Sequence, residues 1–298
     1  MKRFSALLLL ALSVVVVVDA RAACSPVGMS RAGLETLKAS KWAIADDGAR
    51  NQFALALTAC LGDPDPSLRD GIAFEALQFY MRSRLLSDQT MLALGLDLQA
   101  KLTLDDPLGF HTPFAALVLS EVARADRVNA FLTGAQRRRL LDSAVAYMVG
   151  IRDYRGFDAK EGYRHGVAHC ADLLMQLALN PALGKAELLR VRDAVASQVA
   201  PEGVSYITGE SERLARPILV IAGRKVFSET EWSAWFGSVA GPGALGTWDN
   251  WFLSVNGIAR RHNLTLFVST LYVNIDVSAD DAFAPMRAGV LSALKALP

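Results

Sequence analysis

The chain has 298 residues, of which 52% are hydrophobic and 20% are charged, and its formal net charge is +1. This balance excludes a strongly basic nucleic-acid binder, so we expect no nucleic-acid partner. The hydrophobic content also excludes a disordered chain, and the length is sufficient for one large folded domain.

The first 22 residues have the pattern of a secretory signal peptide. Lys2 and Arg3 precede an apolar run over residues 4–18, and residues 20–22 form a small-x-small cleavage site. The apolar run is shorter than the roughly 20 residues that a membrane-spanning helix needs. We therefore expect residues 1–22 to be removed, which predicts a secreted or periplasmic protein with no membrane contact after cleavage.

Three cysteines follow this segment, at Cys24, Cys60 and Cys170. In an oxidising compartment a disulfide between Cys24 and Cys60 is a reasonable candidate, with Cys170 left over. The alternative is that all three are small buried hydrophobic residues. A lipoprotein anchored at Cys24 is a further alternative, which Arg21 disfavours because such sites usually have an aliphatic residue there.

Helix start signals recur along the rest of the chain, and strand signals are almost absent. Residues that commonly cap helices precede apolar segments at Asp65, Ser87, Thr112, Thr133 and Ser228. Two of them, Thr133 and Ser228, have Gln136 and Glu231 three residues later, which is the capping-box pattern. Further helices are expected over residues 162–179, 186–199, 211–222, 264–272 and 280–296.

The lengths and connections of these helices predict the architecture. Short connections between helices favour antiparallel helical hairpins, and the hairpins begin roughly 40 to 50 residues apart, a spacing typical of HEAT or armadillo repeats. The sequence therefore predicts an all-α fold of stacked antiparallel helical hairpins, a HEAT/armadillo-like α-solenoid. We expect it to form a single domain over residues 23–298.

Two of the four histidines, His165 and His169, lie four residues apart. If the predicted helix over residues 162–179 forms, both imidazoles share one face with Asp172, and the opposite face is apolar. Two imidazoles one turn apart can bind one metal ion, with Asp172 as a third ligand or as the group that orients a ring. A Zn²⁺ ion held in this way could activate a water molecule.

Two other interpretations of this segment remain open. In the first, the histidines bridge neighbouring helices, and Asp153, Arg155 and Asp172 form buried ion pairs. In the second, the same residues line a metal-free site for a polar ligand. Glu210 and Glu212 begin another predicted helix, where acidic residues are favourable. Alternatively, one of them meets the histidines from an adjacent hairpin and supplies a carboxylate for a metal ion or a general base.

The chain resembles the DUF2785 domain family, for which no activity is established. The matching segments are residues 63–70 (DPDPSLRD), 114–119 (FAALVL), 155–172, 209–215 (GESERLA) and 270–272 (TLY). The most specific is the pattern Arg-Gly…Gly-x-x-His-x-x-Ala-His-x-Ala-Asp. The resemblance implies an all-helical fold and a candidate site. The chain departs from the family at Tyr163, where a tryptophan is usual, and at Gly71, where an acidic residue is usual.

Four tryptophans, Trp232, Trp235, Trp248 and Trp251, lie within twenty residues of one another. Aromatic residues three apart on a helix are usually core residues, although a tryptophan platform beside acidic residues could also bind a sugar. The sequence therefore leaves glycan binding as a minor hypothesis.

Two functions emerge as the main hypotheses. The first is a binding or scaffolding module, whose polar groove around His165, His169 and Asp172 takes a protein or a small polar ligand. The alternative is a zinc-dependent hydrolase that uses the same three residues as ligands, with Arg155 stabilising an anion.

Overall fold

The computed structural model describes residues 24–278 and 280–298. The predicted signal peptide over residues 1–22 lies outside the described residues. The regular secondary structure within them is almost entirely helical, and the strands form one two-stranded antiparallel hairpin, β1 (Phe157–Asp158) and β2 (Gly162–Tyr163). The all-helical part of the fold prediction is confirmed.

The helices follow one another with short connections. Their bounds are α1 (Arg31–Ala39), α2 (Asp47–Leu57), α3 (Pro66–Leu68), α4 (Glu75–Arg82), α5 (Asp88–Lys101), α6 (His111–Val128), α7 (Gly134–Gly150), α8 (Gly166–Ala178), α9 (Lys185–Val199), α10 (Glu210–Gly223), α11 (Glu229–Val239), α12 (Val255–Ser278) and α13 (Ala284–Ala296). A π-helical segment (Arg69–Phe74) joins α3 to α4.

Side-chain caps explain where many of these helices begin. The side chains of Asp65, Ser87, Thr133 and Ser228 each accept a hydrogen bond from a backbone N–H in the first turn, as predicted. The prediction for Thr112 was wrong. α6 begins one residue earlier, and Asp106 in the preceding loop accepts the hydrogen bond from Thr112 N at 2.9 Å.

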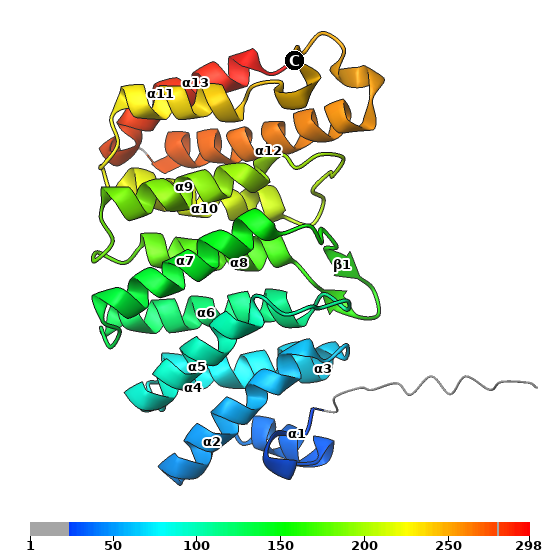
Figure 1. Ribbon diagram of the computed structural model, residues 1–298, viewed down its shortest axis with the longest axis vertical. Helices are drawn as coiled ribbons and strands as arrows, with labels where there is room; N and C mark the ends of the chain where they lie inside the picture. Colours follow the sequence, from blue (N-terminus) through cyan, green and yellow to red (C-terminus); the bar gives the residue numbers. More distant parts are fainter. Residues whose placement is uncertain (1–23, 279) are drawn as a thin grey trace, which may run out of the picture.

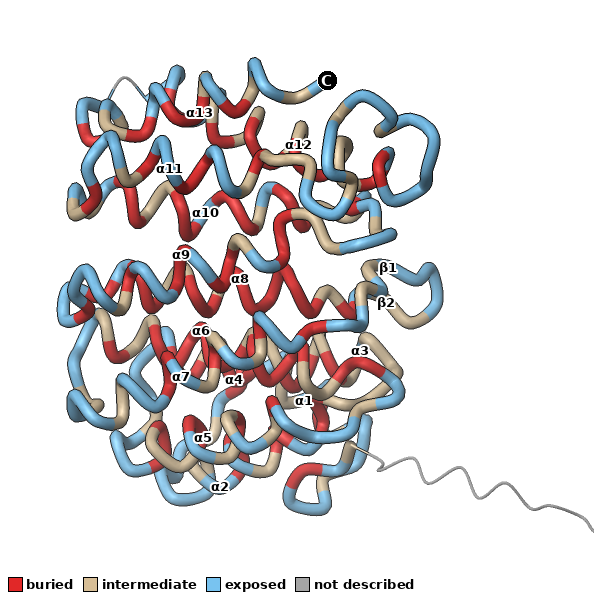
Figure 2. The backbone as a smooth tube through the Cα atoms, turned by 45° about the horizontal axis from the view of Figure 1, so that its top comes forward, coloured by how far each residue is buried: buried red, intermediate tan, exposed pale blue. Residues whose placement is uncertain are grey.

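The helices lie in successive layers along the long axis of the molecule, in the order of the sequence up to α10, and α12 then lies between α10 and the paired helices α11 and α13 (Figure 1). α6, α8, α10 and α12 contact one another in succession, and α5, α7 and α9 do the same beside them. Buried residues run through the middle of this stack and are dense along α8 (Figure 2). The stack thus buries the apolar faces of successive helices against each other.

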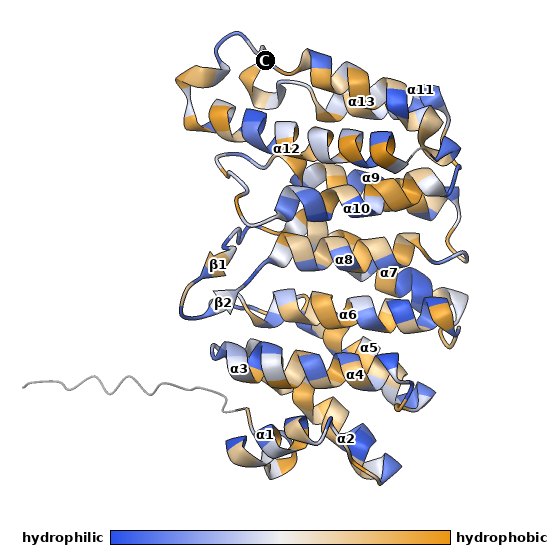
Figure 3. Ribbon diagram, turned by 180° about the vertical axis from the view of Figure 1, so that it is seen from behind, coloured by the Kyte–Doolittle hydropathy of each residue, from blue (hydrophilic) through white to orange (hydrophobic). Residues whose placement is uncertain are grey.

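The β1–β2 hairpin projects at one edge of the stack, beside the ends of α6 and α8 (Figure 3). It immediately precedes α8, so it determines how the histidine segment enters that helix.

The N-terminal end of the described chain is tied to the fold covalently. Cys24 and Cys60 form a disulfide with a Cα–Cα distance of 4.7 Å, and Cys170 is a buried free thiol on α8. Across the described residues, no helix combines the length and the apolar character that crossing a membrane requires.

Candidate functional site

His165 does not lie on the helix that the sequence predicted for it. α8 begins at Gly166, and His165 has left-handed backbone angles, φ 58° and ψ 36°. The reason is the β1–β2 hairpin, after which the backbone N–H groups of Arg164 and His165 bond back to the carbonyls of Gly156 and Arg155. The chain therefore turns at His165 before the helix starts, and the expected helical register from residue 162 is not formed.

The His165 imidazole connects the hairpin to α10. Its Nε2 atom lies 2.7 Å from the carbonyl oxygen of Thr208 and 3.4 Å from Oε1 of Glu210. The ring also stacks on Tyr163, with ring centroids 4.6 Å apart. If Nε2 carries the proton and donates it to this carbonyl, only Nδ1 of His165 is left to bind a metal ion.

Glu210 meets His165 from the adjacent helix, whereas Glu212 is exposed. Burial raises the pKa of the Glu210 carboxyl, but hydrogen bonds from His165 and Thr208 outweigh this effect, and the net result is a lowered pKa. Glu210 is therefore ionised and acts as a hydrogen-bond acceptor within the interface of α8 and α10.

His169 is buried on α8, against the edge of the Phe114 ring at a centroid distance of 5.0 Å. Its Nδ1 atom has no hydrogen-bond partner. Burial, reinforced by the nearby guanidinium of Arg213, holds the pKa of His169 well below its usual range. The imidazole is therefore neutral and packs as a core aromatic ring.

Asp172 faces basic residues instead of the histidines. Arg213 on α10 binds its carboxylate through Nε, 3.0 Å from Oδ1, and through Nη2, and Arg216 Nη1 lies 3.8 Å away. In the part of the chain that the structure describes, no group of three His, Cys, Asp or Glu side chains is placed to hold a metal ion. The rings of His165 and His169 do lie next to each other, with centroids 5.8 Å apart, but among the described residues these two and Asp172 do not form a group that could hold a metal ion.

Asp153 and Arg155 pair with each other at the rim of the hairpin. Arg155 Nε lies 2.9 Å from Oδ1 of Asp153, and Arg155 Nη2 also donates to the Pro107 carbonyl at 3.1 Å. The two side chains are 40% and 48% exposed, so this pair is half-exposed, and the interpretation in which it is buried was wrong.

The hairpin is anchored by a cluster of Arg69, Phe110 and Arg164 that sequence reasoning missed. Both guanidinium groups lie over the Phe110 ring, each 4.2 Å from its centroid. Arg69 is fully buried and donates to the carbonyl of Glu161 at 2.8 Å, while Arg164 donates to the carbonyl of Leu108 at 2.7 Å. The only signal in the sequence was the position of Arg69 inside a segment that resembles the family.

The small pocket bordered by His165, Tyr206 and Glu210 has a volume of about 0 Å³, and neither His169 nor Asp172 lines it.

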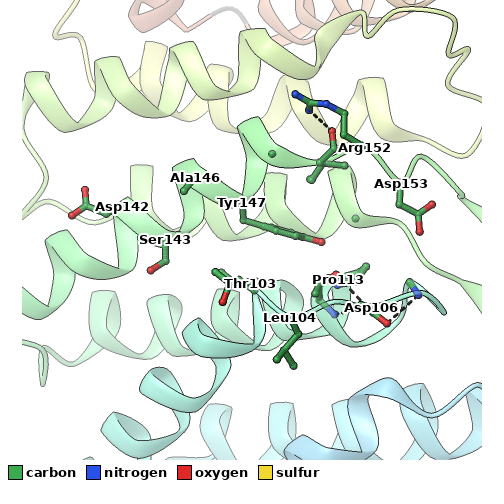
Figure 4. Close-up of a pocket in the computed structure, with 16 residues that line it drawn as sticks. Thr103, Leu104, Asp106, Pro113, Asp142, Ser143, Ala146, Tyr147, Arg152 and Asp153 are labelled. Carbon is green, nitrogen blue, oxygen red and sulfur yellow. Dashed lines mark hydrogen bonds between the residues drawn. The ribbon is translucent and has the colours of Figure 1, made fainter.

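An open cavity of about 570 Å³ lies next to this region, on the other side of Asp153 and Gly166. We call it the Tyr147 cavity. Its lining comes from the α5–α6 connection and the start of α6 (Leu102, Thr103, Leu104, Asp106, Gly109, Thr112 and Pro113), from the end of α7 and the residues after it (Asp142, Ser143, Ala146, Tyr147, Gly150, Ile151, Arg152 and Asp153), and from Gly166. Tyr147 points from α7 toward Pro113, with Asp106 and Asp153 beyond it at one end (Figure 4).

The geometry of this end of the cavity depends on glycine at two positions. Gly109 has φ +72°, and a Cβ there would lie 2.4 Å from Oδ2 of Asp153. A Cβ on Gly166 would lie 3.3 Å from the Tyr147 hydroxyl oxygen. Burial raises the pKa of the Tyr147 hydroxyl, which therefore stays protonated and can donate a hydrogen bond.

The tryptophans do not form a common platform. Trp232 and Trp235 are buried on α11 and pack against Phe236. Trp251 instead lies under the guanidinium of Arg261, 4.6 Å from its ring centroid. The core interpretation therefore holds for the first two.

A protein-family model described as "Protein of unknown function (DUF2785)" matches residues 101–273. This span is more than half of the chain, and it contains the Tyr147 cavity, the hairpin and the histidine segment. No curated protein and no solved structure matches the chain.

Proposed function

The chain belongs to the DUF2785 family, whose function is unknown, and from that premise we propose that it is an exported, single-domain binding module. In this proposal the helices form a HEAT-like solenoid, and the Tyr147 cavity holds a small polar ligand.

The observation that carries the proposal is the cavity itself. Its volume of about 570 Å³ lies in the range of roughly 300 to 1,000 Å³ that is usual for small-molecule sites. It also combines apolar walls with a few polar groups, which is the usual composition of such sites. The apolar side chains include Leu102, Leu104, Pro113 and Ile151, and the hydroxyl groups come from Thr103, Thr112, Ser143 and Tyr147.

The charges around the cavity favour a neutral or cationic ligand. Three carboxylates line it, and Arg152 is the one basic side chain among the lining residues. Arg155 and Arg190 pair with Asp153 and Asp142 from outside the lining. Asp106 accepts hydrogen bonds from the backbone N–H groups of Gly109 and Thr112 and has no ion-pair partner among the described residues. We therefore expect a ligand that carries hydroxyl or amino groups.

The contacts between helices support the solenoid. Each of α6, α8, α10 and α12 contacts the next member of the same row, and each of α5, α7 and α9 does so in the second row. This is the neighbour-to-neighbour pattern of a helical-repeat protein.

Export is supported by the sequence of residues 1–22 and by the disulfide between Cys24 and Cys60, since such bonds persist in oxidising compartments. The intact mass of the secreted or periplasmic protein tests this part. A mature chain that lacks residues 1–22 and two thiol hydrogens agrees with export, and an uncleaved cytosolic chain contradicts it.

A zinc-dependent hydrolase has less support, because the Asp172 carboxylate binds Arg213 and Nε2 of His165 faces a carbonyl. We therefore expect purified protein to contain no stoichiometric zinc. Elemental analysis checks this expectation.

Ligand binding is tested by filling the cavity. Ala146 is an exposed residue on α7 that lines it, so Ala146→Trp should occupy the space without entering the core. Ala135→Trp is the matched control, because Ala135 is exposed on the same helix and lies outside the cavity.

The measurement is mass spectrometry of small molecules extracted from natively purified protein. We expect one compound at stoichiometric amounts in the wild type and in Ala135→Trp, and its loss in Ala146→Trp. Equal amounts in all three proteins would contradict the proposed site.

A further inference from the structure

A second cavity, of about 370 Å³, lies between the end of α4, the start of α5 and the end of α6. We call it the Arg84 pocket. It shares no lining residue with the Tyr147 cavity, so a ligand site here is independent of the proposed function.

The polar side of the Arg84 pocket is basic. Arg82, Arg84 and Arg124 line it from α4, from the α4–α5 connection and from α6, and Asp88 is the one acidic lining residue. Arg82 is already paired with Glu121, at 2.9 Å from Nε to Oε2. The guanidinium groups of Arg84 and Arg124 form no ion pair and no side-chain hydrogen bond with any described residue, so both are available to a ligand.

Apart from Asn129 and the Tyr80 hydroxyl, the remaining wall is apolar. Met81, Leu86, Met91, Val128 and Phe131 line it, and Tyr80 turns its hydroxyl away to donate to the Trp42 carbonyl at 2.9 Å. Methionine side chains adapt to ligands of varied shape. The pocket therefore places two unpaired guanidinium groups beside a hydrophobic surface.

We propose that the Arg84 pocket binds an amphipathic anion, whose carboxylate or phosphate group lies against Arg84 and Arg124 and whose short apolar chain packs on the methionine and phenylalanine side chains. The guanidinium group matches both anions because its N–H groups can donate two parallel hydrogen bonds to them. The carboxylate of Asp88 repels the anion and therefore lowers its affinity for the pocket.

The backbone at Arg84 allows a sharp test. Arg84 has φ 55° and follows α4 in a helix-ending turn, in which Leu85 N bonds to the Tyr80 carbonyl at 2.9 Å. Glycine is the preferred residue at that position, so Arg84→Gly removes the guanidinium group while relieving the backbone. We therefore expect this variant to stay folded, so that a loss of binding reports the missing guanidinium group.

Lys225 supplies the matched control. It has the same φ of 55°, lies in the corresponding turn after α10, and is not part of the pocket. Lys225→Gly thus changes the same charge and the same backbone geometry at a distant place.

The experiment is isothermal titration calorimetry of the full mature chain with octanoate, octyl phosphate, inorganic phosphate and the neutral amphiphile octyl glucoside. We expect octanoate or octyl phosphate to bind more tightly than the other two probes, and the stronger of them identifies the head group. Arg84→Gly and Arg124→Gln should each weaken that binding by about tenfold or more. Lys225→Gly should leave it unchanged, and Asp88→Asn should strengthen it.

Three results would overturn the proposal: no binding of octanoate or octyl phosphate, octyl glucoside or inorganic phosphate binding as tightly as they do, or wild-type affinity in Arg84→Gly. Thermal unfolding of each variant accompanies the titrations, and we expect Arg84→Gly to melt no lower than the wild type.

Discussion

The carboxylate of Asp172 on α8 is held by the guanidinium of Arg213 on α10, with Arg213 Nε 3.0 Å from Oδ1. The two side chains are only 14% and 27% exposed. Desolvation raises the pKa of Asp172, and the positive charge of Arg213 offsets part of this effect. The pair therefore joins two neighbouring helices of the stack at a buried point where an uncompensated charge is costly.

Removing the charge from Asp172 should destabilise the protein. Asp172→Asn leaves Arg213 largely buried without an anionic partner, and we expect the free energy of unfolding to fall by about 3 kcal/mol. Urea denaturation followed by circular dichroism measures it. The double variant Asp172→Leu with Arg213→Met removes both charges and should recover most of the loss. If the single variant is as stable as the wild type, the pair does not hold the helices together.

The buried imidazole of His169 should make stability depend on pH. Its pKa is far below 6.5 in the folded protein, so below about pH 6.5 the unfolded chain binds a proton that the folded chain does not. The contribution of the neutral His169 to the free energy of unfolding is fully present above that pH. It is lost as the pH falls, by at most about 1.4 kcal/mol per pH unit. His169→Leu should therefore flatten the fall in stability between pH 7 and pH 5.

Urea titrations at several pH values measure this slope. Burial also lowers the pKa of His111, so a smaller slope remains in the variant. Cys170→Ala is the control, because it opens a small cavity on the same helix and should lower stability equally at every pH. An unchanged slope in His169→Leu would show that the imidazole titrates in the folded state.

The fold was largely predictable because hydrogen bonds between residues close in sequence determine where most of its helices begin. The cap residues Asp65, Ser87, Thr133 and Ser228 satisfy backbone N–H groups within three residues, so sequence spacing alone places these helix starts. The start of α6 was misplaced because its cap, Asp106, comes from a loop six residues away.

The candidate site was predicted less well, because it depends on contacts between distant residues. Asp172 pairs with Arg213, which lies 41 residues later, and His165 contacts the carbonyl of Thr208, which lies 43 residues later. Periodicity describes which residues share a helix face but gives no information about what lies opposite that face. The hairpin before α8 also interrupts the helical periodicity. It could not be predicted, because a two-residue strand has almost no sequence signal.

Asp126 on α6 is a second buried carboxylate, and its loss should be costly. It accepts hydrogen bonds from the backbone N–H groups of Phe131 and Leu132 and from the side chains of Arg137 and Asn180. Burial raises the pKa of Asp126, but these donors outweigh it and lower the pKa overall. We expect Asp126→Asn to reduce the free energy of unfolding by about 3 kcal/mol, measured by urea denaturation.

The same substitution at an exposed ion pair provides the comparison. Asp142 and Arg190 lie 2.7 Å apart with side chains 59% and 45% exposed. Asp142→Asn should therefore change stability by less than about 1 kcal/mol. Equal effects at Asp126 and Asp142 would mean that the buried hydrogen bonds contribute little.

The disulfide between Cys24 and Cys60 should contribute strongly to stability, because it closes a long loop. The two cysteines are 36 residues apart, and a cross-link of that span restricts the unfolded chain by about 4 kcal/mol. Cys24→Ala with Cys60→Ala should lose about that amount in urea denaturation. A reducing agent should lower the stability of the wild type to that of the double variant, and it should leave the stability of the double variant unchanged. Cys170→Ala retains the disulfide and should remain as sensitive to reductant as the wild type. A wild-type protein with the same unfolding midpoint before and after reduction would contradict a stabilising role, because the N-terminal segment would then be held in place by its noncovalent contacts alone.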